Sequence, residues 1–358
     1  MKTILFAGYA PVHFVCFEPI YRRLAARGDV RVELSGGREP DPEGRGALSA
    51  AKLYSHFDVP AERIVELPDM YEREYDMVFS AHISGYFPKA DRKRVQVFHG
   101  LSFRNMAIRR DVLIYDNLFV IGPYMMRSLM EEKLFRPGSD RLVSTGFAKL
   151  DRLVDGSLKR EDVLRRAGIS GERPVILYAP TGQKGNSLES TGPEVIRRLR
   201  DTGEYDILLK LHDHPRNRAE PGRDELVSLL DDHTRMVDDF DIVPYLFLAD
   251  LVISDASSVT MEYSLMDRPV VFLDVPSLLD SAEKSKKGRF DTETWGRRGG
   301  TVARWPDEAV KAVEWSLANP DAHGDVRRAM AEDLFFNPGK ATDAAEAWIT
   351  SELGLGSS

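Results

Sequence analysis

A polar stretch that follows the apolar residues 251–254 has the strongest chemical signature in the chain. It leads through small residues into Ser257 and Ser258, and a carboxylate follows at Glu262. Unpaired amides at the start of a helix bind anions, and the two serine hydroxyls can donate to phosphate oxygens. Glu262 comes one helical turn after Ser258, where it could accept hydrogen bonds from a ribose diol. The stretch predicts a nucleoside diphosphate site, and an ordinary helix cap is the alternative interpretation.

A second segment, residues 178–185, follows another apolar run and reads Tyr-Ala-Pro-Thr-Gly-Gln-Lys-Gly. Pro180 is expected to end a strand and to present Thr181 and the next amides at its carboxyl end. These groups could also bind phosphate oxygens. A surface loop without a ligand is the alternative interpretation.

The third segment places Lys210, His212 and His214 at the end of the apolar residues 207–211. Alternation along a strand puts Lys210 and His212 on one face, and His214 joins them if the strand extends that far. An ammonium group and an imidazolium could neutralise charge on a leaving phosphate. The two histidines could instead be two ligands of a metal ion, although the sequence fixes no third ligand. Solvent-facing histidines before Pro215 are a further alternative.

His99 follows the apolar residues 95–98 and precedes Gly100. Glycine permits a sharp exit from a strand or close approach of a substrate, so the imidazole is expected to be exposed at the strand tip. A neutral imidazole there is suited to act as a general base toward an acceptor hydroxyl. A structural histidine is the alternative. We assign Gly100, Arg104 and His13 to the acceptor side of the reaction.

These segments need strands that end at a common edge, and the pattern of the chain supplies them. Short apolar runs alternate with helical patterns along the whole sequence, which is typical of parallel sheets covered by helices on both faces. A first helix is expected over residues 17–27, where apolar residues recur at helical spacing. The strands are expected at residues 4–8, 30–35, 64–67, 77–81, 95–98, 118–121, 142–144, 175–178, 207–211, 235–237, 251–254, 270–274 and 301–303.

The length of 358 residues predicts two domains. A charged segment that ends in glycine and proline, residues 151–173, separates two groups of predicted strands. We therefore expect an α/β fold with an N-terminal Rossmann-like acceptor domain over residues 1–155 and a C-terminal nucleotide-donor domain over 170–335. Residues 336–358 are expected to form a helix that packs back toward the N-terminal domain. Open sheets of this kind bind ligands at the carboxyl ends of their strands, so we expect the active site in a cleft between the domains.

Composition limits the classes of protein. The 57 acidic residues exceed the 49 lysines and arginines, and the formal charge of −8 argues against a general nucleic-acid binder. Cys16 is the only cysteine, so no intrachain disulfide can form and a cytoplasmic location is expected. The apolar runs are shorter than the roughly 20 residues of a membrane-spanning helix, and the N-terminus is interpreted as a first strand and not as a signal peptide. Any membrane contact is expected to be peripheral, at the inner face.

Basic residues gather around His99 in this acidic chain. They form either a solvated face or a docking surface for a polyanionic acceptor or an anionic lipid surface. The residues concerned are Lys89, Arg92, Lys93, Arg94, Arg104, Arg109 and Arg110.

Taken together, these motifs resemble the CDP-glycerol glycerophosphotransferase family, whose members prime and polymerise teichoic-acid-type glycerol phosphate chains. The resemblance extends from about residue 95 to residue 342, and its most specific part is the Ser-Asp-x-Ser-Ser-Val sequence that begins at Ser254. The matching segments, in the order of the family, are residues 98–100, 178–181, 210–212, 250–259, 268–269 and 335–342.

The resemblance implies a GT-B architecture, in which the C-terminal domain binds the donor nucleotide and the N-terminal domain faces it with the acceptor chemistry. It implies that His99 is the catalytic base and that His212 contacts the phosphates of the donor. Asp213 stands where the family has a proline, and His214 offers a second register, so both histidines are candidates. The family has Thr-Pro and a lysine after His-Gly, whereas Leu-Ser-Phe-Arg follows Gly100 here, which leaves the acceptor open.

The implied activity is transfer of a phospho-polyol, glycerol phosphate first of all, from a CDP-linked donor to an acceptor hydroxyl with release of CMP. Such a reaction belongs to the synthesis of teichoic-acid-like or other cell-surface glycopolymers. A small soluble acceptor and a lipid-linked polymer both fit, and the donor alcohol and the oligomeric state stay open. No metal and no cofactor are expected besides the donor. The expected donor-binding residues are Thr181, Lys210, Ser254, Asp255, Ser257, Ser258 and Glu262.

A UDP-sugar glycosyltransferase or a UDP-sugar 2-epimerase is the main alternative, because the same fold can hold UDP and Glu262 fits that activity equally well. A catalytically silent nucleotide-binding protein is a third hypothesis, and the altered segment after Gly100 supports it. Release of CMP, as opposed to UMP or UDP, separates the first two hypotheses. Binding without turnover would favour the third.

Overall fold

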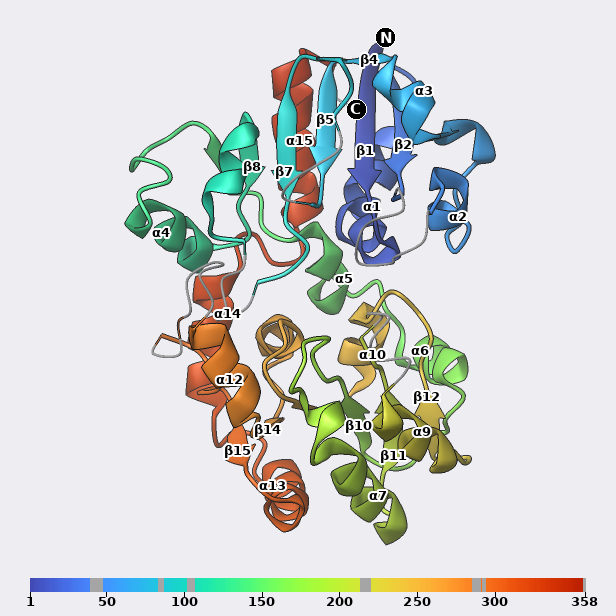
Figure 1. Cartoon of the computed structure of the whole chain (residues 1–358), viewed down its shortest axis with the longest axis vertical. Helices are drawn as coiled ribbons and strands as arrows, with labels where there is room; N and C mark the ends of the chain where they lie inside the picture. Colours follow the sequence, from blue (N-terminus) through green and yellow to red (C-terminus); the bar gives the residue numbers. More distant parts are fainter. Residues whose placement is uncertain are drawn as a thin grey trace. The chain divides into compact units, whose positions relative to one another are not determined.

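The computed structural model describes residues 1–38, 48–82, 87–101, 107–212, 220–284, 291 and 294–356. Within these residues the fold is α/β, and parallel strands alternate with helices as the sequence predicts (Figure 1). Contacts divide the chain into two compact units. The first comprises Met1–Gly100, Ala107–Asp151 and Leu334–Ser358, and the second is mainly Arg152–Asp333.

The first unit is built on a sheet whose described strands are all parallel, in the order β3-β2-β1-β5-β7-β8-β9. Strand β1 (Lys2–Gly8) lies near the middle, between β2 (Val30–Gly36) and β5 (Met77–Ser80). The remaining strands of this sheet are β3 (Ile64–Val65), β7 (Arg94–Val97), β8 (Asn117–Phe119) and β9 (Leu142–Val143). A separate parallel pair consists of β4 (Glu74–Tyr75) and β6 (Ala90–Asp91).

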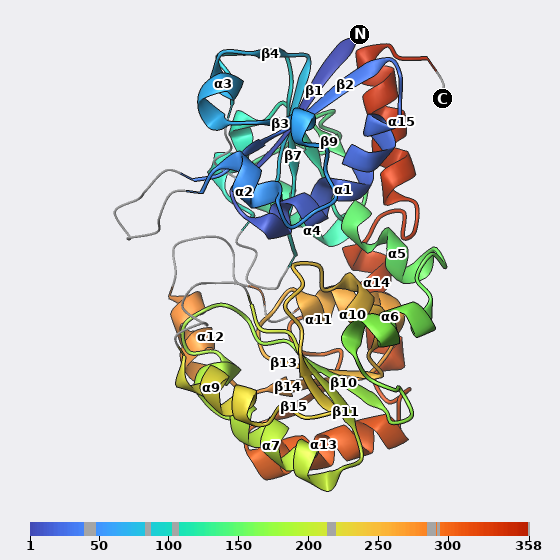
Figure 2. The ribbon, with the colours of Figure 1, turned by 90° about the vertical axis from the view of Figure 1, so that its right-hand side faces the viewer.

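Helices α1 (Pro11–Ala25) and α15 (Ala341–Leu353) share one core with the first sheet. Phe6 of β1 packs there with Phe17 of α1, and Ile349 of α15 belongs to the same apolar cluster. Helix α15 is the last in the sequence, yet it lies beside α1 at the beginning of the chain (Figure 2). The other helical segments of the first unit are α2 (Ala50–Tyr54), α3 (Leu67–Tyr71), α4 (Pro123–Glu131), η1 (Ala61–Arg63), η2 (Arg110–Ile114) and η3 (Ala148–Leu150).

Helix α1 begins at Pro11, six residues before the predicted start at residue 17. Proline is favoured at the first position of a helix because its missing N–H has no partner there in any case. The helix also continues through Pro19, held by its buried apolar face. The prediction of a later start was wrong, and the correction brings His13 into the first turn of the helix.

Asp151 caps α15 from 190 positions away in the sequence. One carboxylate oxygen accepts from the Ala341 amide at 2.9 Å, and the other accepts from the Thr342 amide at 2.8 Å and from the Thr342 hydroxyl at 2.7 Å. The first amides of a helix have no partner inside it, and a negative charge near them is favourable. Asp151 therefore ties the end of the chain to the first unit.

We expect Asp151→Ala to lower the free energy of unfolding by about 2–3 kcal/mol, because the substitution removes three hydrogen bonds to a buried carboxylate. Urea unfolding monitored by circular dichroism measures this effect. Asp155→Ala is the matched control, since Asp155 is exposed and accepts one backbone hydrogen bond from Ser157. A loss for Asp151→Ala no larger than that of the control would show that the cap does not stabilise α15.

The second unit has its own sheet of parallel strands, in the order β12-β11-β10-β13-β14-β15 among the described residues. Helices α7 and α13 pack on each other along one face, and α10 packs on α6 along the other (Figure 2). The strands are β10 (Val175–Tyr178), β11 (Asp206–Leu209), β12 (Thr234–Met236), β13 (Leu251–Ser254), β14 (Val270–Leu273) and β15 (Thr301–Ala303). The helical segments from α5 on are α5 (Asp151–Val154), α6 (Arg160–Ala167), η4 (Ser187–Glu189), α7 (Gly192–Thr202), α9 (Pro221–Ser228), α10 (Val243–Leu248), α11 (Val259–Glu262), η5 (Tyr263–Met266), α12 (Pro276–Glu283), α13 (Pro306–Ala318) and α14 (Gly324–Leu334).

The strand predictions are confirmed. Each predicted strand is present, and its ends lie within two residues of the predicted ones. Strands β4 and β6 were not predicted, because two residues are too few to make a periodic pattern. None of the described helices combines the length and the apolar character that a membrane span requires.

Candidate active site

Three neighbouring strands of the first sheet lead at their carboxyl ends into segments that carry histidine. Tyr9 and His13 follow β1, His82 follows β5, and His99 follows β7. The ring centroids of His13 and His99 are 5.0 Å apart, and the Tyr9 ring stands edge-on to His13 at 4.4 Å and to His82 at 4.3 Å. We call these four residues the imidazole cluster. Sequence reasoning identified His99 and His13 but missed Tyr9 and His82, although His82 obeys the same rule of strand ends as His99.

One hydrogen bond fixes the tautomer of His99. Its Nδ1 atom lies 2.6 Å from the carbonyl oxygen of Ala81. A carbonyl oxygen can only accept, so Nδ1 must carry the proton. In the neutral ring, Nε2 therefore holds a lone pair, which is the form that a general base requires. The residue is exposed, as the sequence predicts for a histidine at a strand tip.

The surroundings keep His99 neutral. Its pKa lies below the ordinary histidine value because the dense protein around the ring disfavours the imidazolium. The hydrogen bond to the Ala81 carbonyl raises the pKa of His99, whereas the nearby Lys149 ammonium lowers it further. The ring can reach solvent and still be poorly solvated as a cation. The result is a base that is available at neutral pH.

His13 has the opposite tautomer. Its Nδ1 accepts a hydrogen bond from the Tyr9 amide at 3.3 Å, so the proton of the neutral ring sits on Nε2. Burial, and then the His99 and His82 imidazoles, hold the pKa of His13 well below its usual value. Gly8 makes room for this ring, because a Cβ atom there would lie 2.8 Å from the Cβ of His13.

The imidazole cluster predicts that the protein loses stability in mild acid. Desolvation, His99 and Arg109 lower the pKa of His82 to about 4, and the pKa values of His13 and His99 are lowered too. The unfolded chain takes up these protons near pH 6.5, so the stabilisation is complete above that pH and is lost as the pH falls toward 4. We expect the free energy of unfolding to decrease over this window in urea titrations. His82→Gln should flatten the slope, and an unchanged slope would contradict the lowered pKa.

The basic residues near His99 are largely paired. Carboxylates lie within salt-bridge distance of the side chains of Lys89, Arg92, Lys93, Arg94 and Arg109. Their partners are Glu72, Asp76, Glu352, Asp91 and Asp111. Of the two interpretations, these pairs favour the solvated face over a surface for a polyanion.

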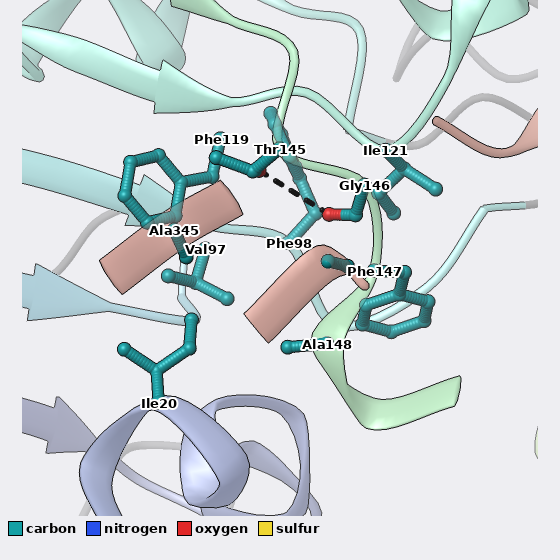
Figure 3. A pocket seen from close by; sticks show the side chains of 11 residues that line it. Ile20, Val97, Phe98, Phe119, Ile121, Thr145, Gly146, Phe147, Ala148 and Ala345 are labelled. Carbon is teal, nitrogen blue, oxygen red and sulfur yellow. Dashed lines mark hydrogen bonds between the residues drawn. The ribbon is translucent and has the colours of Figure 1, made fainter. Parts of the chain in front are cut away.

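A small cavity in the first unit is not the candidate site. Its volume is about 10 Å³, and Figure 3 shows apolar side chains around it, including Val97, Phe119 and Ala345. A single water molecule needs at least about this volume. The labelled polar groups are Thr145 and Gly146, whose hydroxyl and carbonyl are joined to each other at 3.3 Å. The cavity is a packing defect, with no room for a nucleotide.

In the second unit, Asp255 is the centre of a hydrogen-bond network at the carboxyl ends of β10 and β13. Oδ1 accepts from the amides of Thr181 at 2.9 Å and Ala256 at 2.6 Å. Oδ2 accepts from the Ser187 amide at 2.9 Å and its hydroxyl at 2.7 Å. Asp255 is fully buried, and these bonds place it as a support of the loop after β10. Ser254 acts similarly, because its hydroxyl donates to the Ala179 carbonyl at 2.5 Å.

The loop after β10 also meets the segment after β11. A Cβ atom on Gly182 would lie 2.6 Å from Nδ1 of His212, so glycine lets the imidazole pack directly on this loop. Strand β11 ends at Leu209, before both Lys210 and His212. Lys210 is 6% exposed and donates from Nζ to the Leu211 carbonyl at 3.1 Å, whereas His212 is exposed. Because β11 ends before both residues, strand alternation does not fix the direction of these two side chains.

The turn after β13 differs from the predicted helix start. The α-helix α11 begins at Val259 and has a single turn, after which η5 continues as a 3-10 helix. Ser257 precedes the helix, and its Oγ accepts from the Val259 amide at 3.4 Å. A single turn has a weak dipole, so anion binding here must depend mainly on amides and hydroxyls. Glu262 is 1% exposed.

Arg104 and His214 lie outside the described residues. Sequence reasoning missed Asn186, which is buried and whose Nδ2 donates to the Thr181 carbonyl at 2.6 Å. Its Oδ1 also caps η4, and the signal for it was the cap pattern of an asparagine followed three residues later by Glu189.

Comparison with known proteins identifies a matching family model, described as CDP-Glycerol:Poly(glycerophosphate) glycerophosphotransferase, over residues 61–338. The teichoic acid glycerol-phosphate primase of Bacillus spizizenii is 26% identical over 193 residues, which are 53% of this chain and 48% of that protein. The chain spans about half or less of the length of the curated relatives it matches.

Solved structures share the fold. A variant of the wall teichoic acid polymerase TagF superposes with a TM-score of 0.72 at 17% identity, covering 99% of this chain and 89% of that one. UDP-GlcNAc 2-epimerase from Neisseria meningitidis gives a TM-score of 0.59 at 16% identity, covering 99% of each chain. At these identities the likeness shows the fold class, which is GT-B-like as predicted.

Proposed function

The chain belongs to the CDP-Glycerol:Poly(glycerophosphate) glycerophosphotransferase family, and from this premise we propose that it transfers glycerol phosphate from CDP-glycerol to an acceptor hydroxyl. The product chain would be a teichoic-acid-like glycopolymer. The observation that carries the proposal is the family match over residues 61–338, which contains His99, Lys210 and His212.

The proposed reaction begins at His99. The acceptor hydroxyl gives its proton to Nε2 while its oxygen forms a bond to the phosphorus that bears the glycerol. The bond from this phosphorus to the bridging oxygen breaks, and the electron pair leaves with CMP. The bond between Nδ1–H and Ala81 supports the imidazolium that forms, because it holds the ring in one orientation and stabilises the new charge.

The phosphates of the donor are assigned to groups of the second unit. Cationic Lys210 and the imidazole of His212 would offset charge as it develops on the departing CMP. Hydroxyls of Thr181, Ser257 and Ser258 would donate to phosphate oxygens. Glu262 is assigned to the ribose diol. Asp255 and Ser254 act as positioning residues, because their polar atoms already bind the protein's own groups.

A donor screen with the purified protein tests the proposal. CDP-glycerol, CDP-ribitol and a UDP-sugar are each incubated with glycerol 3-phosphate as acceptor, and mass spectrometry monitors CMP, UMP and UDP. We expect release of CMP that depends on the acceptor. Release of UMP or UDP alone would favour the UDP-sugar alternative, and nucleotide binding without turnover would favour a silent binding protein.

The setting of the reaction is part of the proposal. We assign it to the cytoplasm, with at most peripheral contact to a membrane, and the single buried Cys16 is typical of a reducing compartment. A lipid-linked polymer and a small soluble polyol phosphate are both acceptable as acceptors. No nucleic acid is involved in the proposed reaction.

A further inference from the structure

His13 has a proton donor that the proposed reaction does not yet use. Its Nδ1 is occupied by the Tyr9 amide, so Nε2 carries the proton of the neutral ring. No hydrogen-bond partner for Nε2 occurs among the described residues. The His13 side chain is 2% exposed, so its Nε2–H has little contact with solvent and gains by pairing with an oxygen.

His99, with its ring centroid 5.0 Å from that of His13, offers the complementary group. Its Nδ1 donates to Ala81, and its Nε2 accepts. Two neighbouring imidazoles therefore present one donor and one acceptor. Two vicinal hydroxyls match this pair, because one can give its proton to His99 while the oxygen of the other accepts from His13.

The geometry points to His13 as an acceptor-binding residue, whose Nε2–H donates to the oxygen next to the attacking hydroxyl of a vicinal polyol. This assignment rests on the proposed function and names the acceptor chemistry that the function leaves open. The hydrogen bond would be made in the ground state and in the transition state alike, so it should act mainly on the KM of the acceptor.

The surrounding residues hold His13 in this role. Gly8 allows the ring its close position against the end of β1, and any larger residue would collide with its Cβ. The Tyr9 ring stands edge-on to both His13 and His82, which restricts the tilt of each imidazole. Burial keeps the ring neutral, so Nδ1 remains an acceptor for the Tyr9 amide.

Two substitutions separate the two nitrogens of His13. In His13→Asn, the side-chain oxygen can still accept from the Tyr9 amide, but nothing reaches the position of Nε2. In His13→Gln, the amide reaches that position and can donate there. With CDP-glycerol saturating and glycerol 3-phosphate varied, we expect His13→Asn to raise the acceptor KM about tenfold with kcat changed less than threefold. His13→Gln should recover much of the loss.

His323→Gln is the control, because His323 belongs to the second unit and its ring lies against Trp315. It should change the acceptor KM by less than twofold. An equal rise in KM for His323→Gln, no rise for His13→Asn, or no recovery in His13→Gln would overturn the assignment.

Binding of glycerol 3-phosphate alone distinguishes failure of this inference from failure of the proposed function. Nitrogen chemical shifts of ¹⁵N-histidine-labelled protein report the two rings directly. Perturbation of both rings in the wild type and a weaker perturbation of His99 in His13→Asn, without CMP release from CDP-glycerol, would support the acceptor site and reject the donor. Release of CMP with an unchanged acceptor KM in His13→Asn would retain the function and reject the role of His13, as would the absence of any perturbation.

Discussion

We expect His99→Asn to reduce the rate of acceptor-dependent CMP release by about 10²- to 10⁴-fold, the usual contribution of a general base. Asparagine is the informative replacement, because its amide nitrogen can donate to the Ala81 carbonyl as Nδ1 does now. The substitution thereby keeps a hydrogen bond to the Ala81 carbonyl and removes the lone pair at Nε2. The affinity for CDP-glycerol should change by less than about threefold, since the base acts on the acceptor.

The pH profile adds a second test of His99. Because its pKa is lowered, the wild-type rate should fall only when the pH drops below the ordinary histidine range. The residual rate of His99→Asn should lack this acidic limb. His323→Gln serves as a control for loss of an imidazole elsewhere, since His323 belongs to the second unit and contacts Trp315. A His99→Asn rate above a tenth of the wild type would reject the assigned base.

Most of the strands were predictable because they are buried and therefore read as short apolar runs. The same pattern located Thr181, His99 and the turn after β13, since the polar residues that follow a buried strand must lie at its carboxyl end. The order of strands then decides which ends are neighbours. The sequence does not state this order, so the meeting of His13, His82 and His99 was not predicted.

The roles of Asp255 and Ser254 could not be predicted from residue type. A carboxylate in a phosphate-binding turn is equally compatible with a ligand contact and with support of the backbone. The number of amides that donate to the carboxylate decides between these two roles. The amides of Thr181 and Ser187 lie 74 and 68 positions away from Asp255 in the chain. Long-range pairing of this kind leaves no local pattern.

Helix ends were the weakest part of the sequence prediction. Helix α1 starts at Pro11 because a proline at the first position is favourable, whereas the apolar spacing alone suggested a later start. The turn after β13 was expected to begin a regular helix at Ser257. Val259 begins a single α-helical turn instead, and the transition to a 3-10 helix depends on packing that spacing does not reveal.

Asp255→Asn is expected to impair donor binding severely, by about 100-fold in the affinity for CDP. The carboxylate accepts four hydrogen bonds, two on each oxygen. An amide in its place keeps one oxygen and turns an NH₂ group toward at least one backbone N–H, which cannot accept a hydrogen bond. The loop after β10 would lose its attachment, and with it the positions of Thr181 and of Gly182 against His212. Isothermal titration with CDP measures the affinity.

Loss of stability alone could also weaken CDP binding, and Asp206→Asn controls for it. Asp206 is equally buried and accepts from the Gly171 amide at 3.1 Å and pairs with His233 at 2.8 Å. Asp206 is the first residue of β11, so it lies at the amino edge of the second sheet. Asp255 follows β13 and lies at the opposite edge of the same sheet. Both variants should lose about 2–4 kcal/mol of unfolding free energy, because each disturbs a buried carboxylate. Only Asp255→Asn should lower the affinity for CDP by more than about threefold. An equal loss of CDP affinity in the two variants would mean that the network around Asp255 supports the fold without shaping the donor site.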